Sequence, residues 1–371
     1  MEIPFWTQIK RCQRILLTGC GGGFDFTHAL PLFFALRKLG KTCFLGNFAF
    51  SHIPEGEVVF SAPLREDIDD EQPILYKVTA DTPILGNYFP ERYLSLYFRE
   101  VKGEEVPIYT FVHDCGAQSL RSGYERLCNL LELDGIVLVD GGSDSLMNPL
   151  PGLTPLAPLA PLAWCAQAGD EAGLGTPEED MASLYALDQL RPERPLALRC
   201  LVCLGLGVDR FHDVSDVASL RAVAELTESG AFWGAHTLLG EMEGVAAYRE
   251  AGAFIGARMP RQPSIVGALV ADSIQGRFGN YHSNQMVICC SSGCVPLART
   301  AHSKLFLNPL MSMYWFFDLP GVVRRLRYPG PEMAATRSLG DVSRLIRRTR
   351  QELVRARAIR PTEEYPRTGD F

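Results

Sequence analysis

The sequence lacks the features of a protein that spans a membrane or is exported. No run of eighteen apolar residues is free of charge, proline and glycine, which disfavours a transmembrane helix. The first residues, MEIPFWTQIKRCQRILL, lack the ordered basic, apolar and small-residue regions of a signal peptide. We therefore expect a cytoplasmic protein without a membrane partner.

Two catalytic motifs and a disulfide framework are also missing. Neither a G-x-S-x-G elbow nor a G-x-x-x-x-G-K-[ST] loop occurs, which disfavours serine hydrolases and P-loop nucleotidases. The 11 cysteines are odd in number and dispersed along the chain. Cys200 and Cys203 are predicted to point to opposite faces of one strand, a poor zinc pair. The best metal or redox cluster is Cys289, Cys290 and Cys294, and buried or loop thiols are the alternative.

The composition is that of an ordinary globular protein: 47% of its 371 residues are apolar and 21% are charged. The net charge of −7 hides an asymmetry, because residues 321–360 hold eleven arginines and three acids. The rest of the chain is strongly acidic, which disfavours a nucleic-acid partner. The arginine-rich end is predicted to be a helix docked on the acidic body. Dimerisation, giving a homo-oligomer, or an anionic partner is the alternative role.

The hydrophobic pattern indicates an α/β fold. The segments RILLTG, FTHALPLFFALRKLG and KTCFLGNF form a predicted β-α-β unit, and similar units follow near residues 108–140 and 176–230. We expect a doubly wound, mostly parallel sheet with helices on both faces, a Rossmann-like architecture. A TIM barrel would need eight regular repeats, which the pattern does not provide. The segment NPLMSMYWFFDLPGVVRRL is predicted to be one apolar helix.

The predicted organisation is one α/β domain over residues 1–330, followed by a basic helical extension over 331–371. Within the domain, residues 54–105 form an excursion with minor strands and a short helix. Residues 149–163 are a Pro-Leu-Ala repeat, which favours an extended path and is interpreted as a loop insertion. Residues 176–179 begin a helix with a cap, an N1 proline and first-turn acids.

Glycines and polar side chains follow several predicted strands. In an open parallel sheet, ligands bind outside the carboxyl ends of the strands, where glycine amides can face them. We therefore predict one binding site for a small polar ligand. Its expected residues are Gly21, Gly22, Gly23, Asp25, Asn47, Ser51, Gly141, Gly142 and Ser143. For the first turn, the alternative is a tight turn in which Asp25 caps the next helix.

The first glycine turn does not fit a dinucleotide fingerprint. The third fingerprint position falls on Phe24 or Phe26, and the second strand ends at Asn47 where an acid would hold a ribose. Asp25 also places a negative charge where a pyrophosphate would lie. These departures disfavour NAD and FAD as cofactors.

The stretch VLVDGGSDSLM indicates a divalent cation. Asp140 and Asp144 flank a turn at a strand end, and carboxylates in such turns commonly hold Mg²⁺ or another divalent cation. Asp170 and Glu171 are predicted to complete the cluster, and Glu178 and Asp180 lie further along. The alternative is ordinary turn formation, and acids also suit the first turn of a helix. Because a strand-end turn is expected at the surface, Asp140→Asn should change stability by less than about 1 kcal/mol.

Three histidines lie in polar, turn-like segments, one of them His282 in RFGNYHSN. We select the other two as candidate proton carriers beside the catalytic candidates Asp140 and Asp144. His113 stands beside an aspartate after one predicted strand, and His212 lies in GVDRFHDVS after another. Histidine titrates near neutral pH, which suits acid–base catalysis. A hydrogen-bonding loop histidine is the alternative for each.

Motifs in this order resemble a widespread prokaryotic family classified as a domain of unknown function. They are GGGFD, NFAFS, VDGGSDSLM, GDEAGLGTPEEDMASL, GLGVDRFH and FLNPLMSMYWFFDL, and the resemblance covers most of residues 15–325. It implies a fold and no reaction. It also implies that Met147 and Gly169 would be nearly adjacent without the insertion, which would place Asp170 and Glu171 next to Asp144.

From these features we expect an enzyme, a hydrolase or group transferase, acting with or without a metal on a nucleotide, nucleoside or sugar derivative. The alternative is a non-catalytic protein that binds or senses a metabolite through the same turns. A redox protein that uses the cysteines is a third hypothesis.

Overall fold

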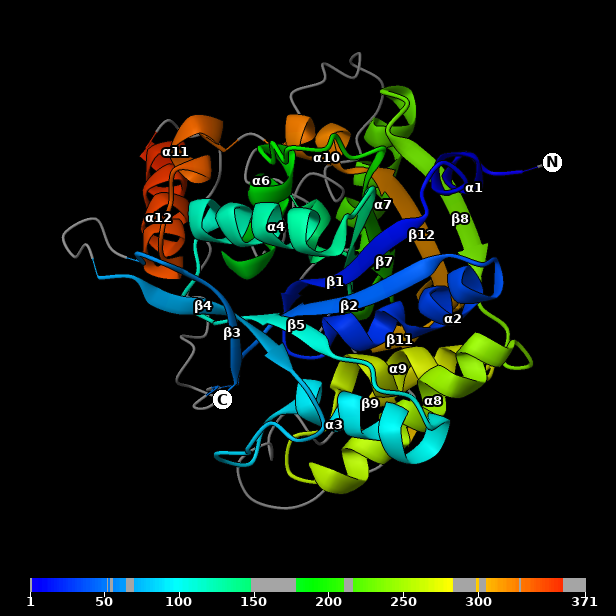
Figure 1. Ribbon diagram of the computed structural model, residues 1–371. Helices are drawn as coiled ribbons and strands as arrows, with labels where there is room; N and C mark the ends of the chain where they lie inside the picture. The colour runs from blue at the N-terminus through cyan, green and yellow to red at the C-terminus, as the bar shows by residue number, and fades with distance from the viewer. Residues whose placement is uncertain are drawn as a thin grey trace, which may run out of the picture.

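A nine-stranded sheet forms the centre of the computed structural model, which describes residues 2–51, 53, 56–64, 70–147, 178–209, 216–282, 298–299, 305–326 and 328–355 (Figure 1). In spatial order the strands are β3 (Glu57–Ala62), β4 (Gln72–Val78), β5 (Ile108–Phe111), β2 (Thr42–Phe48), β1 (Arg14–Gly22), β6 (Gly135–Asp140), β7 (Leu198–Leu204), β12 (Met313–Asp318) and β8 (Phe232–Thr237). The five strands from β5 to β7 are mutually parallel, whereas β4 and β12 run antiparallel to their neighbours. The predicted doubly wound, mostly parallel α/β fold is confirmed.

Helices cover both faces of this sheet (Figure 1). One face carries α4 (Ala117–Leu131), α6 (Glu178–Asp188), α7 (Asp216–Glu228), α10 (Leu319–Arg325), α11 (Gly330–Ala334) and α12 (Leu339–Arg355). The other carries α1 (Pro4–Ile9), α2 (Leu30–Lys38), α3 (Pro90–Tyr97), α8 (Glu243–Arg258) and α9 (Ile265–Ile274). A small antiparallel sheet of β9 (Gly279–His282), β10 (Ala298–Arg299) and β11 (Leu305–Leu307) lies beside α9.

The sheet separates two hydrophobic cores, and its strands contribute to both because alternate side chains point to opposite sides. Leu16 of β1 belongs to one core, whereas Ile15 and Leu17 belong to the other. Cys203 and Cys200 of β7 divide in the same way, which confirms that the two thiols point to opposite faces of the strand. Strands buried on both sides explain the near-continuous apolar runs of the sequence.

The expected apolar helix after residue 308 is wrong. A short 3₁₀ turn, Pro309–Ser312, leads into strand β12, which is inserted antiparallel between β7 and β8. The aromatic run of β12 favours a strand, and tertiary pairing overrides its helical spacing. Helix α10 begins only at Leu319, where Asp318 accepts a hydrogen bond from the Gly321 amide at 3.0 Å.

The excursion and the arginine-rich end attach to the sheet at different places. Strands β3 and β4 extend one edge of the sheet, and α3 packs against α8. Helix α12 packs against α6, with Val342, Leu345 and Ile346 buried. Arg344 and Arg348 pair with Asp341 and Glu332. None of the helices in the described residues has the length and apolarity needed to cross a membrane.

Candidate functional site

The carboxyl ends of β1 and β6 form the switch point of the doubly wound sheet. From β1 the chain crosses through α2, on one face, to β2; from β5 it crosses through α4, on the other face, to β6. Strands β2 and β6 therefore flank β1 on opposite sides, and the crossover helices diverge. Such a switch point opens a crevice that commonly binds ligands in open α/β sheets.

Three aspartates converge at this switch point. Asp25 lies in the 3₁₀ turn after β1, Asp140 ends β6, and Asp180 lies in the first turn of α6. One carboxylate oxygen from each lies within 4.8 Å of the other two. Asp140 and Asp180 are each only 2% exposed. Residues distant in the chain are thus gathered in a space that would fit a metal ion, and the expected meeting of Asp25 and Asp140 is found.

Backbone amides hold Asp25. The Gly21 amide donates to its Oδ2 at 2.9 Å, and the Gly141 amide donates to its Oδ1 at 3.2 Å. A Cβ at Gly21 would lie 2.9 Å from oxygens of both Asp25 and Asp180, and one at Gly141 would lie 2.8 Å from Asp25 Oδ1. These two amides therefore contact a carboxylate instead of the expected ligand, and the glycines leave the carboxylates room.

Asp140 is fixed by a turn and by the neighbouring strand. Its Oδ2 accepts hydrogen bonds from the Ser145 amide at 3.3 Å and from the Ser145 hydroxyl. The thiol of Cys203 on β7 lies 3.7 Å from the same oxygen. The expectation of a surface turn is wrong, because Asp140 is 2% and Asp144 is 7% exposed. The turn Asp144–Leu146 contacts α7 and is buried rather than open to solvent.

Asp180 is the least satisfied of the three. Its Oδ1 is buried and has no hydrogen-bond partner, and the thiol of Cys20 lies beside the carboxylate. The sequence placed Asp180 among several acids at a helix start, where the macrodipole alone would account for it. Only the packing of α6 against β1 shows that this acid turns toward the end of β1.

Two further aspartates surround the group. Asp209, at the turn after β7, accepts a hydrogen bond from the Ser143 amide at 2.7 Å. A Cβ at Gly142 would lie 2.5 Å from Asp209 Oδ1, so glycine is needed there as well. Asp144 is buried nearby but is not one of the three aspartates whose oxygens converge. Gly142 and Ser143 therefore position Asp209, which was not among the predicted site residues.

The cluster concentrates negative charge away from water. Burial raises the pKa of Asp140 to about 6 and that of Asp209 to about 8. Burial also raises the pKa values of Asp25, Asp144 and Asp180 well above the usual range, and neighbouring carboxylates add to each increase. Among the described residues, Asp25, Asp140 and Asp180 form no ion pair with lysine or arginine. Within the described residues, only protons or a bound cation would supply the missing positive charge.

No family model matches the chain, and comparisons with curated proteins and with solved structures find no match. The resemblance to a family of unknown function stays a prediction. The case for a function therefore rests on the geometry of this cluster and its surroundings.

Asn47 and Ser51 lie at the same rim but contact a buried acid. The Asn47 side-chain amide donates to Glu91 Oε1 at 2.7 Å and to the Gly23 carbonyl at 3.0 Å, and Ser51 donates to Glu91 Oε2 at 3.2 Å. Glu91 is fully buried at the start of α3, and burial raises its pKa to about 7. The predicted ligand-binding pair is thus engaged inside the protein, and it fixes the turn that carries Gly23.

Of the remaining predicted site residues, His113 lies within the described part of the chain and the others do not. His113 follows β5 at the rim, and its Nε2 lies 3.1 Å from Glu179 Oε1, an interaction that raises the pKa of the imidazole. His212, Asp170 and Glu171 lie outside the described residues, as do Cys289, Cys290 and Cys294.

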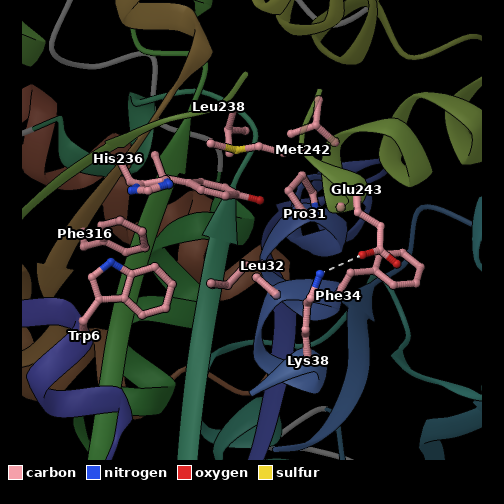
Figure 2. Close-up of a pocket in the computed structure, with 14 residues that line it drawn as sticks. Trp6, Pro31, Leu32, Phe34, Lys38, His236, Leu238, Met242, Glu243 and Phe316 are labelled. Carbon is pink, nitrogen blue, oxygen red and sulfur yellow. Dashed lines mark hydrogen bonds and ion pairs between the residues drawn. The ribbon is translucent and has the colours of Figure 1, made fainter. Parts of the chain in front are cut away.

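A separate apolar pocket lies at the β8 edge of the sheet. It has a volume of about 280 Å³, and Trp6, His236 and Phe316 line one side of it (Figure 2). Lys38 and Glu243 pair with each other at 3.2 Å beside the pocket. None of the clustered aspartates lines this pocket. The pocket is therefore mainly apolar, and the two charges at its rim neutralise each other, in contrast to the acidic switch point.

Proposed function

We propose that this protein is an enzyme that binds a divalent cation through Asp25, Asp140 and Asp180. It would use the cation in hydrolysis of, or group transfer from, a small polar ligand such as a nucleotide, nucleoside or sugar derivative. The observation that carries this proposal is the convergence of three carboxylates at the switch point of the sheet. Mg²⁺ and Mn²⁺ prefer such oxygen ligands.

A purely structural role explains the cluster poorly. Uncompensated buried carboxylates destabilise a fold, and a stable protein normally pairs them or leaves them in water. Asp180 supplies the second observation, because its buried Oδ1 lacks a hydrogen bond and faces the space in front of Gly21 that Asp25 also faces. A cation in that space would satisfy Asp180 and cancel the repulsion among the three groups.

A bound divalent cation would polarise an oxygen of the ligand and lower the pKa of a water molecule. The protein's own residues would perform the remaining tasks. The Gly21 and Gly141 amides fix the orientation of Asp25, and Ser145 with Cys203 fixes Asp140. His113, half exposed at the same rim and held by Glu179, is the candidate proton carrier.

Calorimetric titration with Mg²⁺ and Mn²⁺ tests the cation site. The wild-type protein should bind one ion, and Asp25→Asn and Asp140→Asn should each weaken binding by at least about tenfold. Glu193→Gln is the matched control. Glu193 is an exposed carboxylate in the loop before β7, at the amino ends of the parallel strands and away from the cluster. Equal cation affinity in the wild type and both aspartate variants would refute the proposal.

A turnover assay separates the enzyme from a non-catalytic binding protein. The cation-loaded protein is incubated with nucleoside mono- and diphosphates, nucleosides and sugar phosphates, and products are followed by chromatography. Product formation that requires the cation and is lost in Asp140→Asn would support catalysis. Tight ligand binding without product would instead support a metabolite sensor that uses the same residues.

A further inference from the structure

Phe50 is an exposed aromatic residue at the rim of the proposed cation site. It lies two residues after the end of β2, and 48% of its surface is exposed. A single exposed aromatic side chain is common in proteins and is not evidence of a site. The Phe50 ring is of interest because it packs on the first glycine turn, next to the aspartate cluster.

The ring rests on the backbone of Gly22 and Gly23. A Cβ at Gly22 would lie 2.1 Å from Phe50 Cε1, and one at Gly23 would lie 3.2 Å from Phe50 Cδ2. Only glycine at position 22 leaves space for the ring. The glycine before them, Gly21, faces the carboxylates of Asp25 and Asp180. The three consecutive glycines thus serve two neighbouring purposes: one accommodates the acids and two support an aromatic ring.

A continuous wall joins the ring to the acids. The His113 ring meets Phe50 edge to face, with centroids 5.2 Å apart and an interplanar angle of 79°. His113 Nε2 contacts Glu179, which immediately precedes Asp180 in the chain. The His113 side chain is 47% exposed, so this wall is open to solvent. Because Gly21 and Gly22 are adjacent, the ring and the carboxylates are at most about 10 Å apart.

We propose that Phe50, with His113 packed edge to face against it, is a stacking platform for a nucleobase, so that the ligand of the site is a nucleoside or nucleotide and not a plain sugar derivative. This inference rests on the proposed function and narrows its ligand class. An uncharged planar base can lie beside the acidic cluster without repulsion, and it presents a π face that an aromatic ring contacts over its whole area. The phosphate or ribose of the same molecule would then face the cation.

Calorimetry with the Mn²⁺-loaded protein tests the platform. Adenosine, guanosine, cytidine and uridine 5′-monophosphates are compared with ribose 5-phosphate, which has the same phosphate and sugar without a base. At least one nucleotide should bind roughly fivefold or more tightly than ribose 5-phosphate, and Phe50→Ala should abolish that difference. Phe50→Trp should keep it. Leu130→Ala is the matched control. Leu130 is 46% exposed near the end of α4, at the amino ends of the parallel strands.

A second readout keeps this test independent of the cation site. Adenosine, guanosine, cytidine and uridine are titrated in EDTA into Phe50→Trp, where stacking should quench the fluorescence of the new tryptophan. The same titration into Leu130→Trp should cause no quenching. Mn²⁺ binding without any base preference, and without quenching, would overturn the platform and leave the cation site intact. Base binding through Phe50 in a protein that binds no Mn²⁺ would support the platform and refute the proposed cation site. Loss of both would refute both.

Discussion

The acidic switch point and the apolar pocket at the β8 edge carry charge in opposite ways. At the pocket, Lys38 and Glu243 lie 3.2 Å apart, and each side chain is 78% exposed. At the switch point, Asp140 and Asp180 are each 2% exposed, and no basic side chain among the described residues pairs with them. Solvated, paired charges cost a fold little, whereas buried like charges destabilise it. This contrast supports the proposal that the switch point binds a cation.

The largest expected effect follows from Asp180→Asn. The asparagine keeps the shape, loses no hydrogen bond at Oδ1 and removes an ionisable carboxyl that is buried beside other carboxylates. We expect the free energy of unfolding of the cation-free protein at pH 8 to rise by about 1–3 kcal/mol. Stabilisation by added Mn²⁺ should disappear in the same variant.

Urea unfolding with and without Mn²⁺ measures both quantities. Glu193→Gln, which also removes one negative charge, provides the control and should behave as the wild type in both. A destabilised cation-free Asp180→Asn protein that still gains stability from Mn²⁺ would show that Asp180 supports the fold instead of the site.

The second prediction concerns pH. The folded pKa values of about 6 for Asp140 and about 8 for Asp209 exceed the ordinary value of an aspartate. The folded, cation-free protein therefore holds protons that the unfolded chain has already released, and its stability should fall as pH rises from about 4 to about 8. A bound cation replaces those protons, so cation affinity should increase over the same interval.

Titration of Mn²⁺ in two buffers of different ionisation enthalpy counts the protons released. We expect release at pH 6 that diminishes toward pH 8.5. A cation affinity that is constant over this interval would contradict the assignment of the buried aspartates as ligands.

A smaller effect is expected from Gly21→Ala. The added Cβ would lie 2.9 Å from oxygens of Asp25 and Asp180, which can rotate away because they are side-chain ends. The fold should persist, and cation affinity should fall by about tenfold because the ligand geometry changes. The control is Gly252→Ala, an exposed position in α8 with open space around it. That variant should gain up to about 1 kcal/mol of stability and bind the cation normally.

The sequence was a good guide to the sheet because its signal is local. Apolar runs that end in glycine turns identified β1, β2, β6 and β7, and with them the rim on which Asp25 and Asp140 meet. Strand β12 was misassigned because its identity depends on pairing with β7 and β8, and no short-range pattern records that pairing. Its aromatic run was the one available signal.

The partners within the site were harder to predict for the same reason. Acids are common in the first turn of a helix, so the sequence around Asp180 gave no reason to assign it a second role. Glu91 and Cys203 contact the predicted residues from α3 and from the interior of β7, positions that only the packed structure brings near. The glycines were predicted to present amides to a ligand, whereas in the structure they leave space for carboxylates and for Phe50, which depends on side chains elsewhere in the chain.

The smallest expected effect returns to the pocket at the β8 edge. Lys38→Met and Glu243→Gln, alone and together, form a double-mutant cycle on the exposed ion pair. Because both side chains are solvated and pay side-chain entropy to meet, the coupling should be within about 0.5 kcal/mol and should vanish in high salt. Neither variant should alter Mn²⁺ affinity, since neither residue contacts the switch point. A coupling above about 2 kcal/mol, measured by urea unfolding, would show that the pair is shielded from water. In that case the contrast between solvated and buried charge would not distinguish the two regions.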